Sequence, residues 1–154
     1  MYSENNLKNV WEDMDQNFNN EKLFEREDIP DANYPVNIEK AELTYSKSKL
    51  PMVTIGFRIA DYVTYWGNKV VYWNQVLTNR KQLDRVMFMI NSILKPFEKT
   101  HEFTSYKELG EELSGLVELT KDRAYLLEVL TTKRGYKVFR IEQWSTITKI
   151  YLMI

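Results

Sequence analysis

The spacing of hydrophobic residues changes twice along this chain, and this change limits the folds that the chain can adopt. Between residues 36 and 59 apolar residues alternate with polar ones, and residues 70–77 form a run that is apolar on both faces, so we predict three strands. From residue 83 to residue 97 apolar residues recur every three or four positions, which predicts a helix that ends at Pro96. Alternation returns from residue 125 to residue 142. The predicted order is therefore three strands, a helical segment and a hairpin.

The first predicted strand changes parity along its length. Val36 and Ile38 alternate with polar residues, whereas Ala41 and Leu43 alternate on the opposite parity. One extra residue in a strand has this effect, so we predict a β-bulge near residues 39–40, where the strand bends.

Local signals predict two strand-joining turns and a second helix. The turns lie at residues 46–50 and 131–136, which are polar segments between alternating runs. Ser105 is followed three positions later by Glu108, which is the pattern of a capping box, and Gly115 is expected to end that helix.

This order of elements is that of an OB-fold, a small five-stranded barrel. A bent first strand fits such a barrel, because closing it requires bent strands. For residues 34–154 we therefore predict a mostly β, α+β domain: an OB-fold-like five-stranded barrel with a helical insertion between strands 3 and 4. A different α+β meander is the alternative. Residues 146–154 are expected to form a last strand or an apolar strip.

Charge is divided unevenly between the two parts of the chain. Residues 1–34 hold nine acidic and three basic side chains, a net charge of −6, and the remainder holds thirteen acidic and eighteen basic ones, a net charge of +5. We therefore predict an acidic arm over residues 1–33, with a short amphipathic helix over residues 7–18. A basic body predicts an anionic partner, and ordinary solvated surface is the alternative.

Composition gives no support to an enzyme. The chain has no cysteine, one histidine (His101) and five glycines. It therefore lacks the residues for thiol catalysis, a thiolate or multi-histidine metal site, or a glycine-rich phosphate loop. We expect no catalytic residue, no metal and no cofactor. The sequence also predicts neither a signal peptide nor a membrane-spanning helix.

Basic and aromatic residues are mixed in the predicted strand 2–3 region and in the two turns that flank the ligand face of an OB-fold. Cations neutralise phosphates while rings stack on bases, so this mixture suits single-stranded nucleic acid. The alternative interpretation is that the turn lysines are only solvated and that the rings pack beneath a loop. One of residues 72 and 73 must face the core, because neighbouring residues of a strand point to opposite faces. The predicted nucleic-acid-binding residues are Lys47, Lys49, Arg58, Tyr65, Trp66, Lys69, Tyr72, Trp73, Lys133, Arg134 and Tyr136.

Several segments of the chain resemble a family of small phage-encoded proteins regarded as OB-fold single-stranded-DNA-binding proteins. These segments are residues 29–43, 46–53, 57–59 and 74–77, and the hairpin at residues 125–129 and 133–139. The resemblance covers about half of the chain. It implies a replication or recombination accessory that coats single strands, with Lys47, Lys49, Trp73, Lys133 and Arg134 near the DNA. Bacterial single-strand-binding proteins usually end in a flexible acidic tail that recruits partners. This chain ends in apolar residues instead, and its acidic segment is at the N-terminal end.

We therefore expect a phage single-stranded-DNA-binding protein with low sequence specificity, which forms a homo-oligomer in the host cytoplasm and does not bind membranes. An aromatic platform would accept RNA as well. Phage or host replication and recombination proteins are the expected protein partners. The alternative is a phage protein-interaction module that binds or inhibits a host factor and does not touch DNA.

Overall fold

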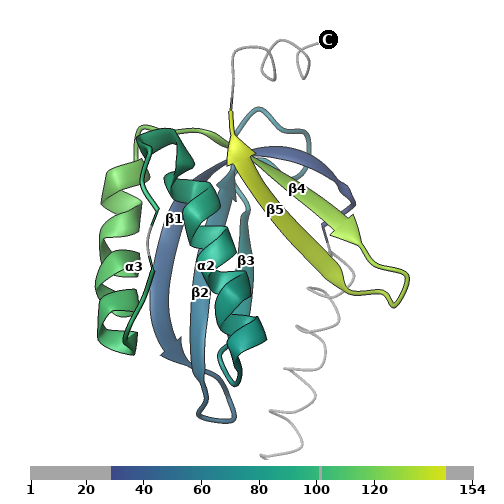
Figure 1. Cartoon of the computed structure of the whole chain (residues 1–154). Helices are drawn as coiled ribbons and strands as arrows, with labels where there is room; N and C mark the ends of the chain where they lie inside the picture. The colour runs from purple at the N-terminus through teal and green to yellow at the C-terminus, as the bar shows by residue number, and fades with distance from the viewer. Residues whose placement is uncertain (1–28, 101, 145–154) are drawn as a thin grey trace, which may run out of the picture. The chain divides into compact units, whose positions relative to one another are not determined.

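A five-stranded antiparallel sheet is the centre of the computed structural model, which describes residues 29–100 and 102–144 (Figure 1). Its strands lie in the order β3-β2-β1-β4-β5. Their bounds are β1 (Ala32–Tyr45), β2 (Pro51–Ile59), β3 (Val70–Val76), β4 (Tyr125–Thr131) and β5 (Lys137–Gln143). Two helices complete the fold, so the predicted α+β class is confirmed.

Strand β1 is long enough to pair with two neighbours, and it contains a bulge. Its first part, residues 32–36, pairs with β4, and residues 36–45 pair with β2. The register with β2 shifts between Ile38 and Lys40, which confirms the predicted bulge. Each side of the bulge keeps its apolar residues toward the core, since Val36, Ile38 and Ala41 are all buried.

Helix α2 (Arg80–Leu94) begins where the sequence predicts a change of period. The Asn79 side chain caps it by accepting a hydrogen bond from the Gln82 backbone N–H at 3.0 Å. A short 3₁₀ turn, η1 (Lys95–Phe97), follows and contains Pro96. The Tyr125 hydroxyl donates to the Ile93 carbonyl at 2.7 Å. This bond pairs one of the carbonyls that the last helical turn leaves without an intrahelical partner.

Helix α3 (Tyr106–Thr120) begins at the predicted Ser105 cap, whose hydroxyl accepts from the Glu108 backbone N–H at 3.1 Å. The prediction that Gly115 ends this helix is wrong. The helix continues to Thr120 because Leu116 and Thr120 extend its buried face, which anchors another turn. Gly115 lies on the solvent side, where nothing approaches within 4 Å of the position of a Cβ.

The core lies between the sheet and the two helices. Val53, Ile55, Phe57 and Ile59 are four alternate residues of β2, and each is fully buried. Helix α3 contacts β1, while α2 contacts both β3 and β5 (Figure 1). Helix α2 therefore spans the two edges of the sheet.

The predicted barrel does not close. In the described part of the chain, β3 and β5 are the two edges of the sheet and do not pair with each other. Helix α2 contacts both edge strands, so a helix rather than a ladder of hydrogen bonds joins them. The candidate site described below lies at this opening between β3 and β5.

Several predictions fall on residues that the structure does not describe. These are the amphipathic helix at 7–18, nearly all of the acidic arm, His101 and the C-terminal strip at 146–154. Strand β1 includes residues 32 and 33, which were predicted to belong to the acidic arm. Among the described helices, none combines the length and the apolar character needed to cross a membrane.

Candidate nucleic-acid interface

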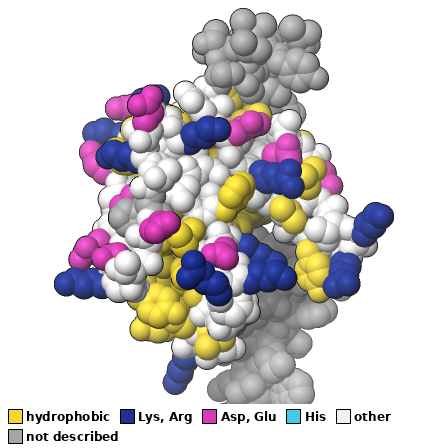
Figure 2. Space-filling view, in the orientation of Figure 1, with side chains coloured by type: hydrophobic (Ala, Val, Ile, Leu, Met, Phe, Trp, Pro, Cys, Tyr) yellow, Lys and Arg dark blue, Asp and Glu magenta, His cyan; other side chains and the backbone are white. Residues whose placement is uncertain are grey.

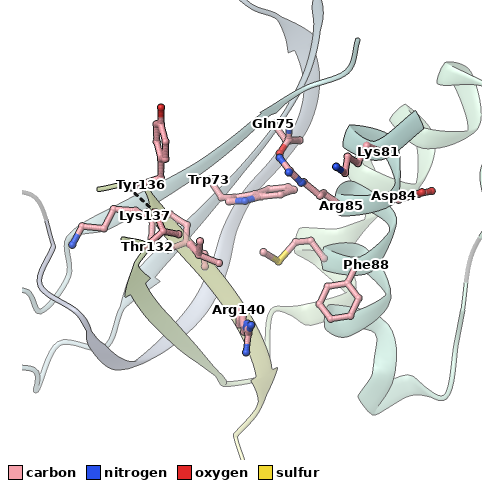
Figure 3. Close-up of a pocket in the computed structure, with 13 residues that line it drawn as sticks. Trp73, Gln75, Lys81, Asp84, Arg85, Phe88, Thr132, Tyr136, Lys137 and Arg140 are labelled. Atoms are coloured by element: carbon pink, nitrogen blue, oxygen red, sulfur yellow. Dashed lines mark hydrogen bonds between the residues drawn. The ribbon is translucent and has the colours of Figure 1, made fainter. Parts of the chain in front are cut away.

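A groove of about 890 Å³ lies between the two sheet edges, along one face of helix α2. We call it the β3–β5 groove. Strand β3 supplies one wall, α2 lies along it, and β5 with the β4–β5 turn supplies the other wall (Figure 3). Its lining residues are Trp73, Gln75, Lys81, Asp84, Arg85, Phe88, Met89, Thr132, Tyr136, Lys137, Val138, Phe139 and Arg140.

The lining of the groove is basic, with four cations and one acid and hence a net charge of +3. Lys81 and Arg85 are exposed on α2, and within the described residues neither forms an ion pair. Lys137 is held by Asp31 at 3.0 Å, and Arg140 lies opposite Glu128 across the β4–β5 pair. The two α2 cations are therefore the ones most open to an anionic ligand.

The cations in the first turn of α2 do not stabilise this helix. Arg80 and Lys81 lie in the first turn, which has no acidic residue. The positive end of the helix dipole disfavours cations there, by roughly 0.3–1 kcal/mol for each charge. Arg80 pairs with Asp84 at 3.1 Å, but Lys81 has no such compensation among the described residues. The cation at Lys81 therefore does not stabilise the start of this helix.

Aromatic side chains line the same groove. Figure 3 shows the Trp73 ring pointing from β3 toward α2, with Arg85 reaching from the helix toward Gln75. Phe88 on α2 is 70% exposed, and Tyr136 at the far rim is 69% exposed. Figure 2 shows Lys and Arg side chains beside hydrophobic ones on this face of the molecule. The groove thus offers rings for stacking and cations for phosphates in one place.

The orientation of β3 decides which of its aromatic residues reaches the groove. Trp73 pairs with Ile55, and Tyr72 pairs with Gly56. Directly paired residues share a face, so Trp73 lies on the same face as the buried Ile55 and Tyr72 lies on the opposite, outer face. Trp73 lines the groove and is only partly exposed.

The two predicted turns have one hydrogen-bond pattern. In each, a hydroxyl, that of Ser46 or Thr132, accepts from the backbone N–H four residues on, at 3.2 Å and 3.1 Å, and the residue just before that N–H is left-handed. The left-handed residues are Lys49, with a φ of 64°, and Gly135, with a φ of 87°. The turns carry four exposed predicted cations, none of which lines the groove: Lys47, Lys49, Lys133 and Arg134.

Arg58 on the outer face of the sheet is already engaged. Its Nη2 forms an ion pair with Glu39, and its Nη1 donates to the Asn68 carbonyl at 2.7 Å. The hydrogen bond to Glu39 raises the pKa of Arg58 above its ordinary value. Arg58 therefore ties β1 and the β2–β3 connection to β2, and it brings no uncompensated charge to this face.

Tyr72 stands on the same outer face, above a glycine. A Cβ on Gly56 would lie 3.1 Å from Tyr72 Cε1, so the ring occupies the space that a side chain would fill. Nearby, Lys40 pairs with Glu42 at 3.1 Å. Lys40 and Arg58 on this face are thus each paired with a glutamate, whereas the groove lining keeps a net positive charge.

Three predicted residues of the β2–β3 connection form a cluster of their own. The Lys69 Nζ lies 3.8 Å from the centroid of the Tyr65 ring and 4.8 Å from that of Trp66. The two rings meet edge to face at 5.4 Å. The ammonium is therefore used within the cluster, and it covers part of the aromatic surface.

Of the predicted site residues, the structure brings Trp73 and Tyr136 together in the β3–β5 groove and places the other nine elsewhere. Sequence reasoning missed the contribution of α2, namely Lys81, Arg85 and Phe88. These residues are spaced by four and then three positions, so they lie on one face of the helix, away from its buried apolar face. An apolar residue beside two cations on an exposed helix face was the sequence signal that could have indicated them. In the described part of the chain, no group of three or more His, Cys, Asp or Glu side chains is arranged to hold a metal ion.

The family model described as a protein of unknown function (DUF669) matches residues 16–124. This match spans more than half of the chain, so the chain belongs to that family. The matched region includes β3 and α2 and ends just before β4. A search of the curated proteins gives no significant match.

Proposed function

We propose that this chain binds single-stranded DNA in the β3–β5 groove, with little sequence preference. The observation that carries the proposal is that one groove holds four cations and four aromatic side chains. Cations neutralise phosphates, and rings stack on any base because every base has a π face. The outer face of the sheet is a weaker candidate, because the cations near its exposed tyrosine are paired with glutamates.

The strand arrangement supports an OB-fold-like reading of the architecture. We infer that the order β3-β2-β1-β4-β5, with the helices between β3 and β4, is an OB-fold opened between its third and fifth strands. The resemblance to phage proteins then suggests a role in phage replication or recombination, in the host cytoplasm and as a homo-oligomer. RNA would also fit, since stacking does not require a deoxyribose.

The test is fluorescence anisotropy of a labelled oligo(dT), titrated with the protein at several salt concentrations beside a duplex of the same length. The proposal expects single-strand binding that weakens with salt, and weaker binding to the duplex. Trp73→Ala should lower the affinity about fivefold to a hundredfold, because stacking contributes about 1–3 kcal/mol per base. Trp66→Ala, outside the groove, is the matched control and should change the affinity less than twofold. Equal losses in both variants would contradict the groove.

A protein-interaction module is the second candidate, and the free sheet edges favour it. Strands β3 and β5 have no partner on their outer sides in the described part of the chain, and Phe88 is exposed between them. An extended peptide can add to such an edge. No oligo(dT) binding at low salt, together with a protein complex that salt does not weaken, would favour this reading.

A further inference from the structure

A small hydrogen-bonded network at the rim of the β3–β5 groove holds one of its cations. Asp31 Oδ2 accepts from the Thr131 backbone N–H at 3.0 Å, and Asp31 Oδ1 accepts from Thr131 Oγ1 at 2.6 Å. Lys137 Nζ donates to Asp31 Oδ1 and to Thr131 Oγ1, each at 3.0 Å. Two of the three N–H donors of the ammonium are therefore engaged within the protein.

The network keeps an anion next to this cation. Hydrogen bonds from Thr131 and then from Lys137 hold the pKa of Asp31 below its usual value, so the carboxyl is ionised at neutral pH. The pair of Asp31 and Lys137 carries no net charge, although its side chains remain 44% and 28% exposed. Across the groove, Lys81 and Arg85 have no such partner among the described residues.

We propose that Asp31 is an internal competitor for the anionic ligand: it occupies the Lys137 ammonium and so lowers the affinity of the groove for a phosphate backbone. This inference rests on the proposed function. A phosphate at Lys137 must either displace the carboxylate or share the ammonium with it. Two anions at one ammonium repel each other, and the repulsion is present only in the complex. Asp31 thereby limits how tightly the groove holds a strand.

A purely structural role for Asp31 predicts the opposite sign. If the carboxylate served only to position the β4–β5 hairpin, neutralising it would loosen Lys137 and weaken binding. Asp31→Asn separates the two roles, because the amide keeps an oxygen that can accept from Thr131 but loses the negative charge. A charge-matched control exists on α3, where Glu118 pairs with Lys121 at 2.9 Å outside the groove. Glu118→Gln removes an equal charge from a similar pair.

The experiment measures oligo(dT) affinity of the full-length chain by anisotropy between 50 and 200 mM salt. Asp31→Asn should bind about three- to tenfold more tightly, and its plot of log K against log salt should steepen by about 0.7, which is one added phosphate contact. Glu118→Gln should stay within twofold of the parent. A urea melt of each variant checks that it is folded.

A second substitution completes the test. In the Asp31→Asn background, Lys137→Gln should abolish the gain in affinity, because the added phosphate contact is made by the Lys137 ammonium. Unchanged or weaker binding by Asp31→Asn, or an equal gain in Glu118→Gln, overturns the inference while the proposed function stands. If neither the parent nor Asp31→Asn binds oligo(dT) at low salt, both fail.

Discussion

Replacing the two α2 cations of the groove should change how DNA affinity depends on salt. Each phosphate contact with a single strand contributes about −0.7 to the slope of log K against log salt. With Lys81, Arg85 and Arg140 as contacts, and Lys137 held by Asp31, the parent slope should be about −2.1. The double variant Lys81→Gln/Arg85→Gln keeps one contact, so its slope should be about −0.7.

The difference is large enough to measure. Over a fourfold rise in salt, from 50 to 200 mM, the parent should lose affinity about 18-fold and the double variant about threefold. Anisotropy of a labelled oligo(dT) gives both slopes. Arg80→Gln is the matched control: Arg80 lies in the same helical turn, but it pairs with Asp84 and does not line the groove. Its slope should stay within about 0.3 of the parent value.

A change in the stability of the fold should not contribute to this difference in slope. Both replaced side chains are exposed, and removing the charge of Lys81 from the first turn of a helix does not weaken that helix. The urea midpoint of the double variant should therefore equal or slightly exceed that of the parent. A double variant that keeps a slope near −2 would refute the reasoning, because the phosphate contacts would then come from cations outside α2, with the exposed turn cations as the next candidates.

Two further predictions concern the stability of the fold. Burial raises the pKa of Tyr125 to about 12, so the stabilisation that its neutral form provides is complete below pH 10 and is lost between about pH 10 and 12; this should lower the free energy of unfolding by about 2–3 kcal/mol. Tyr125→Phe should lower the free energy of unfolding by about 1 kcal/mol at pH 7, because the hydrogen bond to the Ile93 carbonyl is lost. It should also reduce the fall in the free energy of unfolding between urea melts at pH 9 and pH 11.5. A fall equal to that of the parent would contradict this explanation. Lys49→Gly should raise the free energy of unfolding by about 0.5–1 kcal/mol, because Lys49 adopts a left-handed φ of 64°, and a lower urea midpoint would count against it.

Features set by neighbouring residues could be predicted from the sequence. The bulge after Ile38 follows from side-chain parity, and the cap at Ser105 follows from the capping-box pattern. The end of α3 was mispredicted because Gly115 was given more weight than the buried face that continues beyond it. Local rules do not include the tertiary packing that extends this helix.

The site was less predictable because its residues meet only through the tertiary fold. Strand β3 is apolar on both faces, so its sequence did not determine that Trp73 faces the groove. Arg58 looked available until the fold brought Glu39, nineteen positions away, onto its guanidinium. The contribution of α2 depends on where the helix lies relative to β5, which no spacing in the sequence encodes.

The most direct test of the account is to map the bound strand on the protein by NMR. Amide and tryptophan indole N–H shifts of the labelled full-length chain are followed as oligo(dT) is added. If the strand lies in the β3–β5 groove, the largest changes will fall on the Trp73 indole and on amides of α2 and of residues 136–140, which line that groove. Changes confined to the β2–β3 connection around Trp66, or no change at low salt, would contradict it.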